Sequence, residues 1–333
     1  MPTVLKLGDS GEKVARLQRA LKSFGFDIAD DGSFGPQTLD TVKAFQSREG
    51  LTADGIAGPF TIEALDLDTD TLEDLIVIDG AGGTPGASSP LQRMLFVDVY
   101  SGDVGGKPNW PAVVAAPDFI GAIIKATNGV SFNTTWFDFN WKALRTVAGD
   151  RYCATWFRGA YHFLLFNRDA NKQAQFYLET IEKAGGLDSG DLIPIVDVEL
   201  GNDGSSGKPR HPNQDATKAQ IIDVTSAWIT YVTQRTDAEV MLYGRGAMRD
   251  RGIREKMGAN WLWNPSYTRT MPRQTIEKVG WTIPEVALWQ YCGDGDGKLQ
   301  GYPTEVKDFG KVDISVCLLD DVSKVIEKLL IKR

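Results

Sequence analysis

The chain has 333 residues, of which 42% are hydrophobic and 24% charged, the composition of a folded protein large enough for two domains. Its net charge of −8 argues against the phosphate backbone of a nucleic acid as partner. No apolar run reaches the roughly 18 residues of a membrane span, and the N-terminus lacks the charged and apolar segments of a signal peptide. We therefore expect neither membrane insertion nor export by the usual secretory route.

Histidine and cysteine are too scarce for several kinds of active site. The two histidines, His162 and His211, cannot build a His-rich zinc centre, and the three cysteines have no CxxC spacing. Chemistry is thus left to the 44 carboxylates, and we expect no metal or other cofactor.

The N-terminal 66 residues contain an internal repeat, in which DGSFGPQT from Asp31 recurs as DGIAGPFT from Asp54. Each copy has a turn-forming Asp-Gly, followed by a Gly-Pro suited to the start of a helix. Apolar residues at helical spacing follow both copies, and a further amphipathic segment begins after Ser10. The pattern predicts a small domain of three short helices.

The segment that contains this repeat opens with LKLGDSGEKVARLQRALKSFGF. Together with the two repeat copies, this stretch resembles the three-helix peptidoglycan-binding module found on many cell-wall hydrolases. The resemblance covers about residues 3–66 and implies that the segment binds bacterial peptidoglycan. The shared Gly, Asp and Leu positions are structural, so they name no ligand contacts.

Residues 67–93 are first acidic and then rich in Gly, Ser and Pro, which predicts a linker between residues 1–66 and a large domain over 94–333. In that domain, short runs rich in β-branched residues alternate with longer segments, of which Lys172–Ala184 and Ala216–Gln234 have helical periodicity. This predicts an α/β fold, a (β/α) barrel whose helices are reduced in its last third. The eight predicted strands are Met94–Tyr100, Gly121–Asn128, Gly159–Phe166, Leu192–Leu200, Val240–Arg245, Trp261–Tyr267, Val286–Cys292 and Lys311–Cys317.

Four acids lie within or at the end of these apolar strands: Asp98, Asp197, Glu199 and Asp313. A buried charge costs several kcal/mol unless it is paired or used, so their recurrence indicates a catalytic cluster. Asp197 and Glu199 are two positions apart and would face one side of a strand, as the two carboxylates of glycoside hydrolysis require. The alternatives are structural ion pairs and a Mg²⁺ or Ca²⁺ site, although no phosphate-cradling loop accompanies the acids.

Aromatic residues at the strand ends are candidates for stacking on a sugar ring. Trp263, Trp289 and Tyr291 are placed on or near such ends, with core packing as the alternative role for each.

The large domain resembles glycoside hydrolase family 25, the lysozyme-type muramidases, over nearly all of residues 94–317. The resemblance implies that Glu199 is the general acid and Asp197 its partner carboxylate, with Asp98 and Asp313 completing an acidic floor. It also implies that Tyr161 and Trp289 line the groove, and we add Tyr243 to the predicted substrate-binding residues. The matching stretches are FVDVYSGD, GAIIKATNG, RGAYHFLLF, IPIVDVEL, VMLYGR, NWLWNPSY, VALWQYCGDG and KVDISVC. The last departs from the family, which usually has Asn where this chain has Ser315.

Both resemblances point to one polymer. They imply an N-acetylmuramidase that cleaves the β-1,4 bond between N-acetylmuramic acid and N-acetylglucosamine in peptidoglycan. We expect a monomeric phage or prophage endolysin that reaches the wall through a holin or an injection machine. The alternatives are a wall- or chitin-binding protein with an inactive barrel, and a chitinase, whose usual DxxDxDxE strand is absent.

The role of Asp197 is open from the residues alone. It can attack the anomeric carbon itself, or orient the substrate's 2-acetamido group to attack in its place, and both routes retain configuration. Inversion would need a wider separation of the two carboxyl groups, which the i, i+2 spacing does not exclude. The family resemblance favours the acetamido route.

Overall fold

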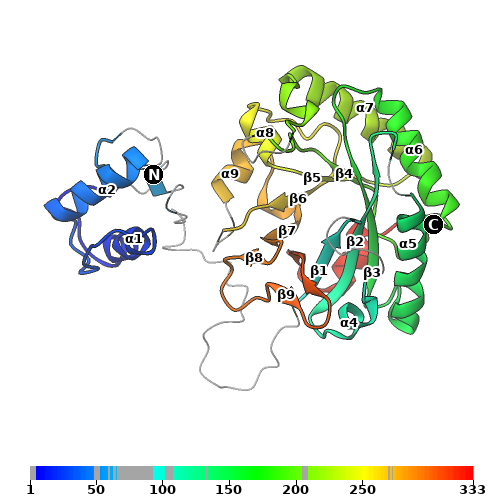
Figure 1. The fold of residues 1–333 in the computed structure, drawn as a ribbon, viewed down its shortest axis with the longest axis horizontal. Helices are drawn as coiled ribbons and strands as arrows, with labels where there is room; N and C mark the ends of the chain where they lie inside the picture. The colour runs from blue at the N-terminus through cyan, green and yellow to red at the C-terminus, as the bar shows by residue number, and fades with distance from the viewer. Residues whose placement is uncertain are drawn as a thin grey trace. The chain divides into compact units, whose positions relative to one another are not determined.

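A computed structural model describes residues 5–48, 53–58, 61–62, 65, 93–101, 108–131, 134–204, 209–268, 271 and 273–332 (Figure 1). The chain divides into two compact units, which we describe separately. The predicted linker lies outside the described residues except for Arg93, and the boundaries at 66 and 93 stay predictions. None of the helices in the described ranges is long and apolar enough to span a membrane.

The N-terminal unit contains the helices α1 (Glu12–Ser23) and α2 (Pro36–Arg48). Their facing sides bury Leu17, Leu21, Val42 and Phe45 in one core. Thr61 and Ile62 are helical, and the rest of the third predicted helix falls largely outside the described residues.

The sequence repeat in this unit is also a structural repeat, because a buried glutamine fixes each copy. Each glutamine amide donates to an Asp carboxylate, a backbone carbonyl and a Thr hydroxyl, and accepts from a Gly N–H. The partners of Gln18 are Asp31, Ser33, Thr38 and Gly32, and those of Gln46 are Asp54, Ile56, Thr61 and Gly55. Both loops are therefore held by a fully bonded amide, the condition under which burying a polar side chain is tolerated.

The second unit is an eight-stranded closed barrel. Its strands follow the order β11-β1-β2-β3-β4-β5-β6-β7, and β7 pairs with β11 to close the ring. Neighbouring strands from β1 to β7 are parallel, and β11 is antiparallel to both β1 and β7. Each predicted strand overlaps one barrel strand, and the observed bounds are β1 Leu95–Val99, β2 Phe119–Asn128, β3 Phe157–Phe163, β4 Ile195–Asp197, β5 Met241–Tyr243, β6 Trp261–Pro265, β7 Val286–Gly293 and β11 Asp313–Cys317.

Helices cover the outside of the barrel unevenly (Figure 1). The long ones, α5, α6 and α7, belong to its first two thirds, whereas α8 and α9 have five and six residues, so the prediction of reduced helices in the last third is confirmed. The helices of this unit are α4 Trp110–Ala115, α5 Thr134–Ala148, α6 Ala170–Lys183, α7 Lys218–Thr236, α8 Gly246–Asp250, α9 Arg273–Lys278 and α10 Val322–Leu329, with the short 3-10 helices η1 Gly149–Arg151, η2 Pro212–Asp215 and η3 Ile283–Glu285.

The eighth strand differs from that of a regular (β/α) barrel, in which every strand is parallel to its neighbours. After β7 the chain folds back through β8 (Asp296–Gly297) and the hairpin of β9 (Glu305–Val306) and β10 (Gly310–Lys311). The structure describes every residue between β7 and β11, and no helix lies there to carry the chain to the other end of the barrel. The strand β11 therefore starts at the end where β7 finishes.

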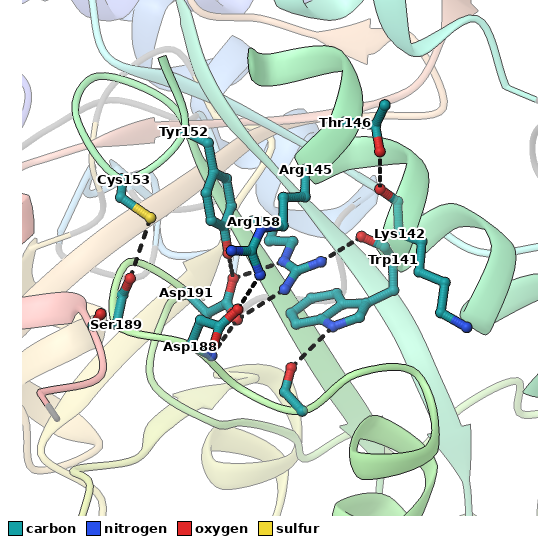
Figure 2. A network of polar contacts seen from close by, with 11 residues as sticks. Trp141, Lys142, Arg145, Thr146, Tyr152, Cys153, Arg158, Asp188, Ser189 and Asp191 are labelled. Atoms are coloured by element: carbon teal, nitrogen blue, oxygen red, sulfur yellow. Dashed lines mark hydrogen bonds and ion pairs between the residues drawn. The ribbon is translucent and has the colours of Figure 1, made fainter. Parts of the chain in front are cut away.

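A buried ion pair connects segments at the end of the barrel where the parallel strands begin (Figure 2). Arg158, at the start of β3, donates from Nε and Nη2 to Asp191 at 2.7 and 3.1 Å, and its guanidinium lies 3.8 Å from the centre of the Trp141 ring. Asp191 also accepts from the Tyr152 hydroxyl and, at 2.7 Å, from the Asp188 N–H. The cluster joins β3, α5 and the segment before β4.

Candidate active site

A cavity of about 210 Å³ opens at the end of the barrel where β1 to β7 finish. It contains all four predicted acids and three of the five predicted substrate-binding residues. Its lining residues are Asp98, Tyr100, Lys125, Tyr161, Phe163, Asp197, Glu199, Tyr243, Trp263, Asp294 and Asp313. The structure thus brings together side chains that are up to 215 positions apart, counted from Asp98 to Asp313.

Three of the four acids lie in strands, and the fourth follows one of them. Asp98 lies in β1 directly opposite Asp313, the first residue of β11. The antiparallel direction of β11 is what brings Asp313 to this rim, because the start of that strand lies beside the ends of the others. Asp197 is the last residue of β4, so Glu199 lies beyond the strand that the sequence predicts to include it. Both side chains nevertheless line the cavity.

Burial makes Asp197 and Glu199 hold a proton more tightly than ordinary carboxyls. Burial raises the pKa of Asp197 well above its usual value, and the neighbouring Glu199 and Asp98 add to that shift. Burial also raises the pKa of Glu199, and the Lys125 ammonium opposes the shift at both acids. The two carboxyls therefore titrate as a pair that keeps one proton at higher pH than a solvated acid would.

Lys125, on β2, is the only basic residue that lines the cavity among those the structure describes. Its ammonium lies 5.0, 5.4 and 4.8 Å from the ring centres of Tyr100, Tyr161 and Phe163. Cation–π attraction of this kind fixes a cation beside the acids. Lys125 is not among the site residues predicted from the sequence, although a lysine inside an apolar strand is the same kind of signal as the strand acids.

The predicted aromatic residues divide by the face of the strand that they occupy. Trp263 points into the barrel, where its Nε1 donates to Ser315 Oγ at 2.9 Å, and Tyr243 packs on it edge to face. Trp289 and Tyr291 alternate with the inward-facing Gln290 on β7 and so point outward, into the core under the outer layer. Their side chains donate to backbone carbonyls there and are covered, so the structure does not place these two residues among those lining the cavity.

Asp197→Asn is expected to raise the melting temperature at neutral pH. A carboxyl whose pKa is raised on folding stabilises the fold fully only below its unfolded pKa, near 3.8, and loses that contribution as pH rises through the folded pKa. The Asp197→Asn variant has no carboxyl that must ionise inside the fold. Its excess in melting temperature over the wild type should therefore disappear below about pH 4. Thermal melts of both proteins from pH 3 to 8 measure this difference in melting temperature. A difference that does not vary with pH would contradict a raised pKa of Asp197 in the folded protein.

A barrel with carboxylates clustered at one rim, two of them poised to keep a proton, has the components of a glycoside hydrolase site. The sequence model described as Glycosyl hydrolases family 25 matches residues 97–300, well over half of the chain. The chain therefore belongs to family 25 of the glycosyl hydrolases. A second model, described as a putative peptidoglycan binding domain, matches residues 10–65.

Solved structures share the fold. A family 25 glycosyl hydrolase from Bacillus anthracis aligns with a TM-score of 0.52 at 21% identity, covering 75% of this chain and 99% of that one. A bacterial lysozyme from Streptomyces coelicolor aligns with a TM-score of 0.52 at 19% identity, covering 71% of this chain and 96% of that one.

Characterised relatives match the N-terminal segment. The N-acetylmuramoyl-L-alanine amidase CwlL of Bacillus licheniformis is 44% identical over 66 residues, which are 19% of this chain and 18% of that protein. The zinc D-Ala-D-Ala carboxypeptidase of Streptomyces albus G is 47% identical over 64 residues, 18% of this chain and 25% of that protein. The chain thus spans a quarter or less of the length of these two relatives.

Proposed function

We propose that this protein is an N-acetylmuramidase, a peptidoglycan hydrolase that cleaves the β-1,4 bond between N-acetylmuramic acid and N-acetylglucosamine. The observation that carries the proposal is the cavity of a family 25 barrel in which Asp98, Asp197, Glu199 and Asp313 converge. The N-terminal match to a peptidoglycan-binding domain supports the same polymer as substrate.

Glu199 is the proposed general acid, which gives its proton to the glycosidic oxygen as the bond to the anomeric carbon breaks. The acetamido oxygen of the substrate attacks that carbon, and water, activated by the Glu199 carboxylate, later opens the resulting ring. Asp197 Oδ1 is buried without a hydrogen-bond partner among the described residues. An acetamido N–H donating to it would favour the Asp197 anion and leave the shared proton on Glu199.

The products of a digest test this function. We expect purified peptidoglycan treated with the protein to yield fragments with N-acetylmuramic acid at the reducing end, detected as muramitol by mass spectrometry after borohydride reduction. Reducing N-acetylglucosamine ends, or free peptides from an amidase, would contradict the proposal.

Stereochemistry tests the acetamido route. Attack by the substrate's own group followed by water retains configuration, so proton NMR should show the β-anomer as the first-formed reducing end. An initial α-anomer would require inversion and would remove Asp197 from the proposed role.

Deleting residues 1–66 is expected to weaken binding to intact walls at least tenfold, because a tethered module raises the local concentration of enzyme by about 10²-fold or more. Hydrolysis of short soluble glycans should change by less than about twofold, since the deletion removes no contact with the transition state. Co-sedimentation with purified walls measures binding. Equal sedimentation of both forms would contradict the wall-binding role.

The proposed setting is lysis of a bacterial host by a phage or prophage, with the enzyme reaching the wall through a holin or an injection machine. Expression in a bacterial cytoplasm should then leave cells intact until a holin is co-expressed. Lysis by the enzyme alone would contradict this route.

A further inference from the structure

One uncharged side chain beneath the cavity bonds to two of the four acids. Gln290, on β7, is fully buried and faces the barrel interior. Its Nε2 lies 3.0 Å from both carboxylate oxygens of Asp98 and 3.2 Å from Oδ2 of Asp313. One amide group thus donates to both members of the directly opposed pair of β1 and β11.

Two tyrosine hydroxyls determine which way this amide points. Tyr243 and Tyr267 donate to Gln290 Oε1 at 2.8 and 3.0 Å. Burial raises the pKa of both phenols, so both remain protonated donors across the pH range in which the enzyme would work. A flipped amide would turn Oε1 toward two carboxylates, which can only repel it when they are ionised. The hydroxyls therefore hold the NH₂ group toward the acids.

Two carboxylates opposite each other in an antiparallel pair repel, and such pairs commonly relieve the repulsion by sharing a proton. A hydrogen-bond donor shared by both carboxylates makes the shared proton unnecessary, because hydrogen bonding to the charged form favours ionisation. The charged form of Asp313 is stabilised by a further hydrogen bond, since its Oδ1 accepts from the Asp294 N–H at 2.6 Å. Asp197 differs in having a buried oxygen without a donor among the described residues.

We propose that Gln290, oriented by Tyr243 and Tyr267, is a positioning residue that keeps Asp98 and Asp313 ionised side by side, so that the proton needed for catalysis stays on the Asp197–Glu199 pair. The inference rests on the proposed muramidase function. It divides the four acids into two that stabilise developing positive charge on the sugar and two that handle the proton and the acetamido group.

The test replaces the donor and reads the pH dependence of the rate. Gln290→Met keeps the shape of the side chain and removes both ends of the amide. Loss of a hydrogen bond to a charged group should lower kcat by about 10- to 100-fold at acidic pH, with KM changed less than about threefold. The acidic limb of the kcat profile should move up by about one pH unit or more, because Asp98 and Asp313 then retain a shared proton.

The titratable groups that face this site all stay in place in Gln290→Met, so a shifted limb traces to the lost amide. Among the described residues, these groups are Asp98, Lys125, Tyr161, Asp197, Glu199, Tyr243, Tyr267, Asp294 and Asp313. Tyr243→Phe combined with Tyr267→Phe frees the amide to turn, and should move the acidic limb in the same direction by a smaller amount.

Gln173→Met is the matched control. Gln173 is an equally buried glutamine on α6 that bonds the backbone of Leu165, outside the cavity. Its loss should lower the melting temperature without moving the acidic limb. A pH-independent fall in kcat for Gln290→Met, with the same limb as the wild type, would overturn the inference.

A second measurement separates this outcome from failure of the proposed function. Carbon-13 NMR titration of the aspartate carboxyls in the intact protein needs no substrate. Gln290→Met should raise the titration midpoints of Asp98 and Asp313, and unchanged midpoints would reject the positioning role even if the wild type cleaved no glycan.

Discussion

Glu199→Gln is expected to reduce turnover on peptidoglycan by about 100-fold or more, the usual contribution of general acid catalysis. The amide has nearly the shape of the protonated acid but cannot release a proton to the leaving oxygen. Burial raises the pKa of Glu199, which keeps the acid form available at a pH where an exposed glutamate has lost it. Single-turnover rates on wall fragments of defined length measure the effect.

The fold of this variant should be intact, and its melting temperature at neutral pH should be equal to or above that of the wild type, because a buried group with a raised pKa no longer has to ionise. Glu179→Gln is a matched control on α6, where the carboxylate is exposed and bonds Gln175. That change should leave turnover within about twofold, as surface substitutions do. A Glu199→Gln protein with the wild-type rate would show that another group gives the proton.

The four acids could be predicted from the sequence because a carboxylate in an apolar strand is anomalous wherever it occurs. Gln290 carries no such signal, since a neutral amide in a strand has many ordinary roles, and only its contacts with Asp98 and Asp313 reveal it. The repeat around Asp31 and Asp54 is visible in the sequence as a pattern. Its cause, a buried glutamine on each preceding helix, is not visible there, because Gln18 and Gln46 lie outside the repeated octapeptides.

The aromatic residues of β7 show what a strand pattern leaves undetermined. Trp289 and Tyr291 lie on a strand that is buried on both faces, so alternation of polar and apolar residues cannot tell inside from outside. Register against β6 decides it, through the pairing of Trp263 with Leu288. The direction of β11 cannot be predicted from the sequence either, because it depends on the hairpins between Gly293 and Asp313 and not on the strand's own residues.

The largest loss of stability is expected from Asp191→Ala, at the end of the barrel away from the cavity. Arg158 and Asp191 are 3% and 0% exposed, so removing the carboxylate leaves a guanidinium buried without its counter-charge. Breaking such a pair costs about 3–5 kcal/mol, and the hydroxyl of Tyr152 and the N–H of Asp188 lose their acceptor as well. The melting temperature should fall by about 6–20 °C for a domain of this size.

Turnover at low temperature separates this stabilising role from a catalytic one. Arg158 and Asp191 lie where β3 begins, whereas the cavity lies where the parallel strands end, so kcat of the folded variant should stay within about twofold of the wild type. Asp188→Ala is the matched control, because its carboxylate pairs with Arg145 at the surface and should contribute about 0–1 kcal/mol.

Replacing both partners completes the test. Arg158→Met with Asp191→Leu removes the two charges together and should recover much of the loss, since apolar side chains of similar volume avoid the desolvation of an unpaired ion. Chemical denaturation of the two single variants and the double variant gives the coupling between the residues. If the double variant were as unstable as the sum of the single variants, the ion pair would not be the reason that these residues stabilise the barrel, and packing against Trp141 would account for it better.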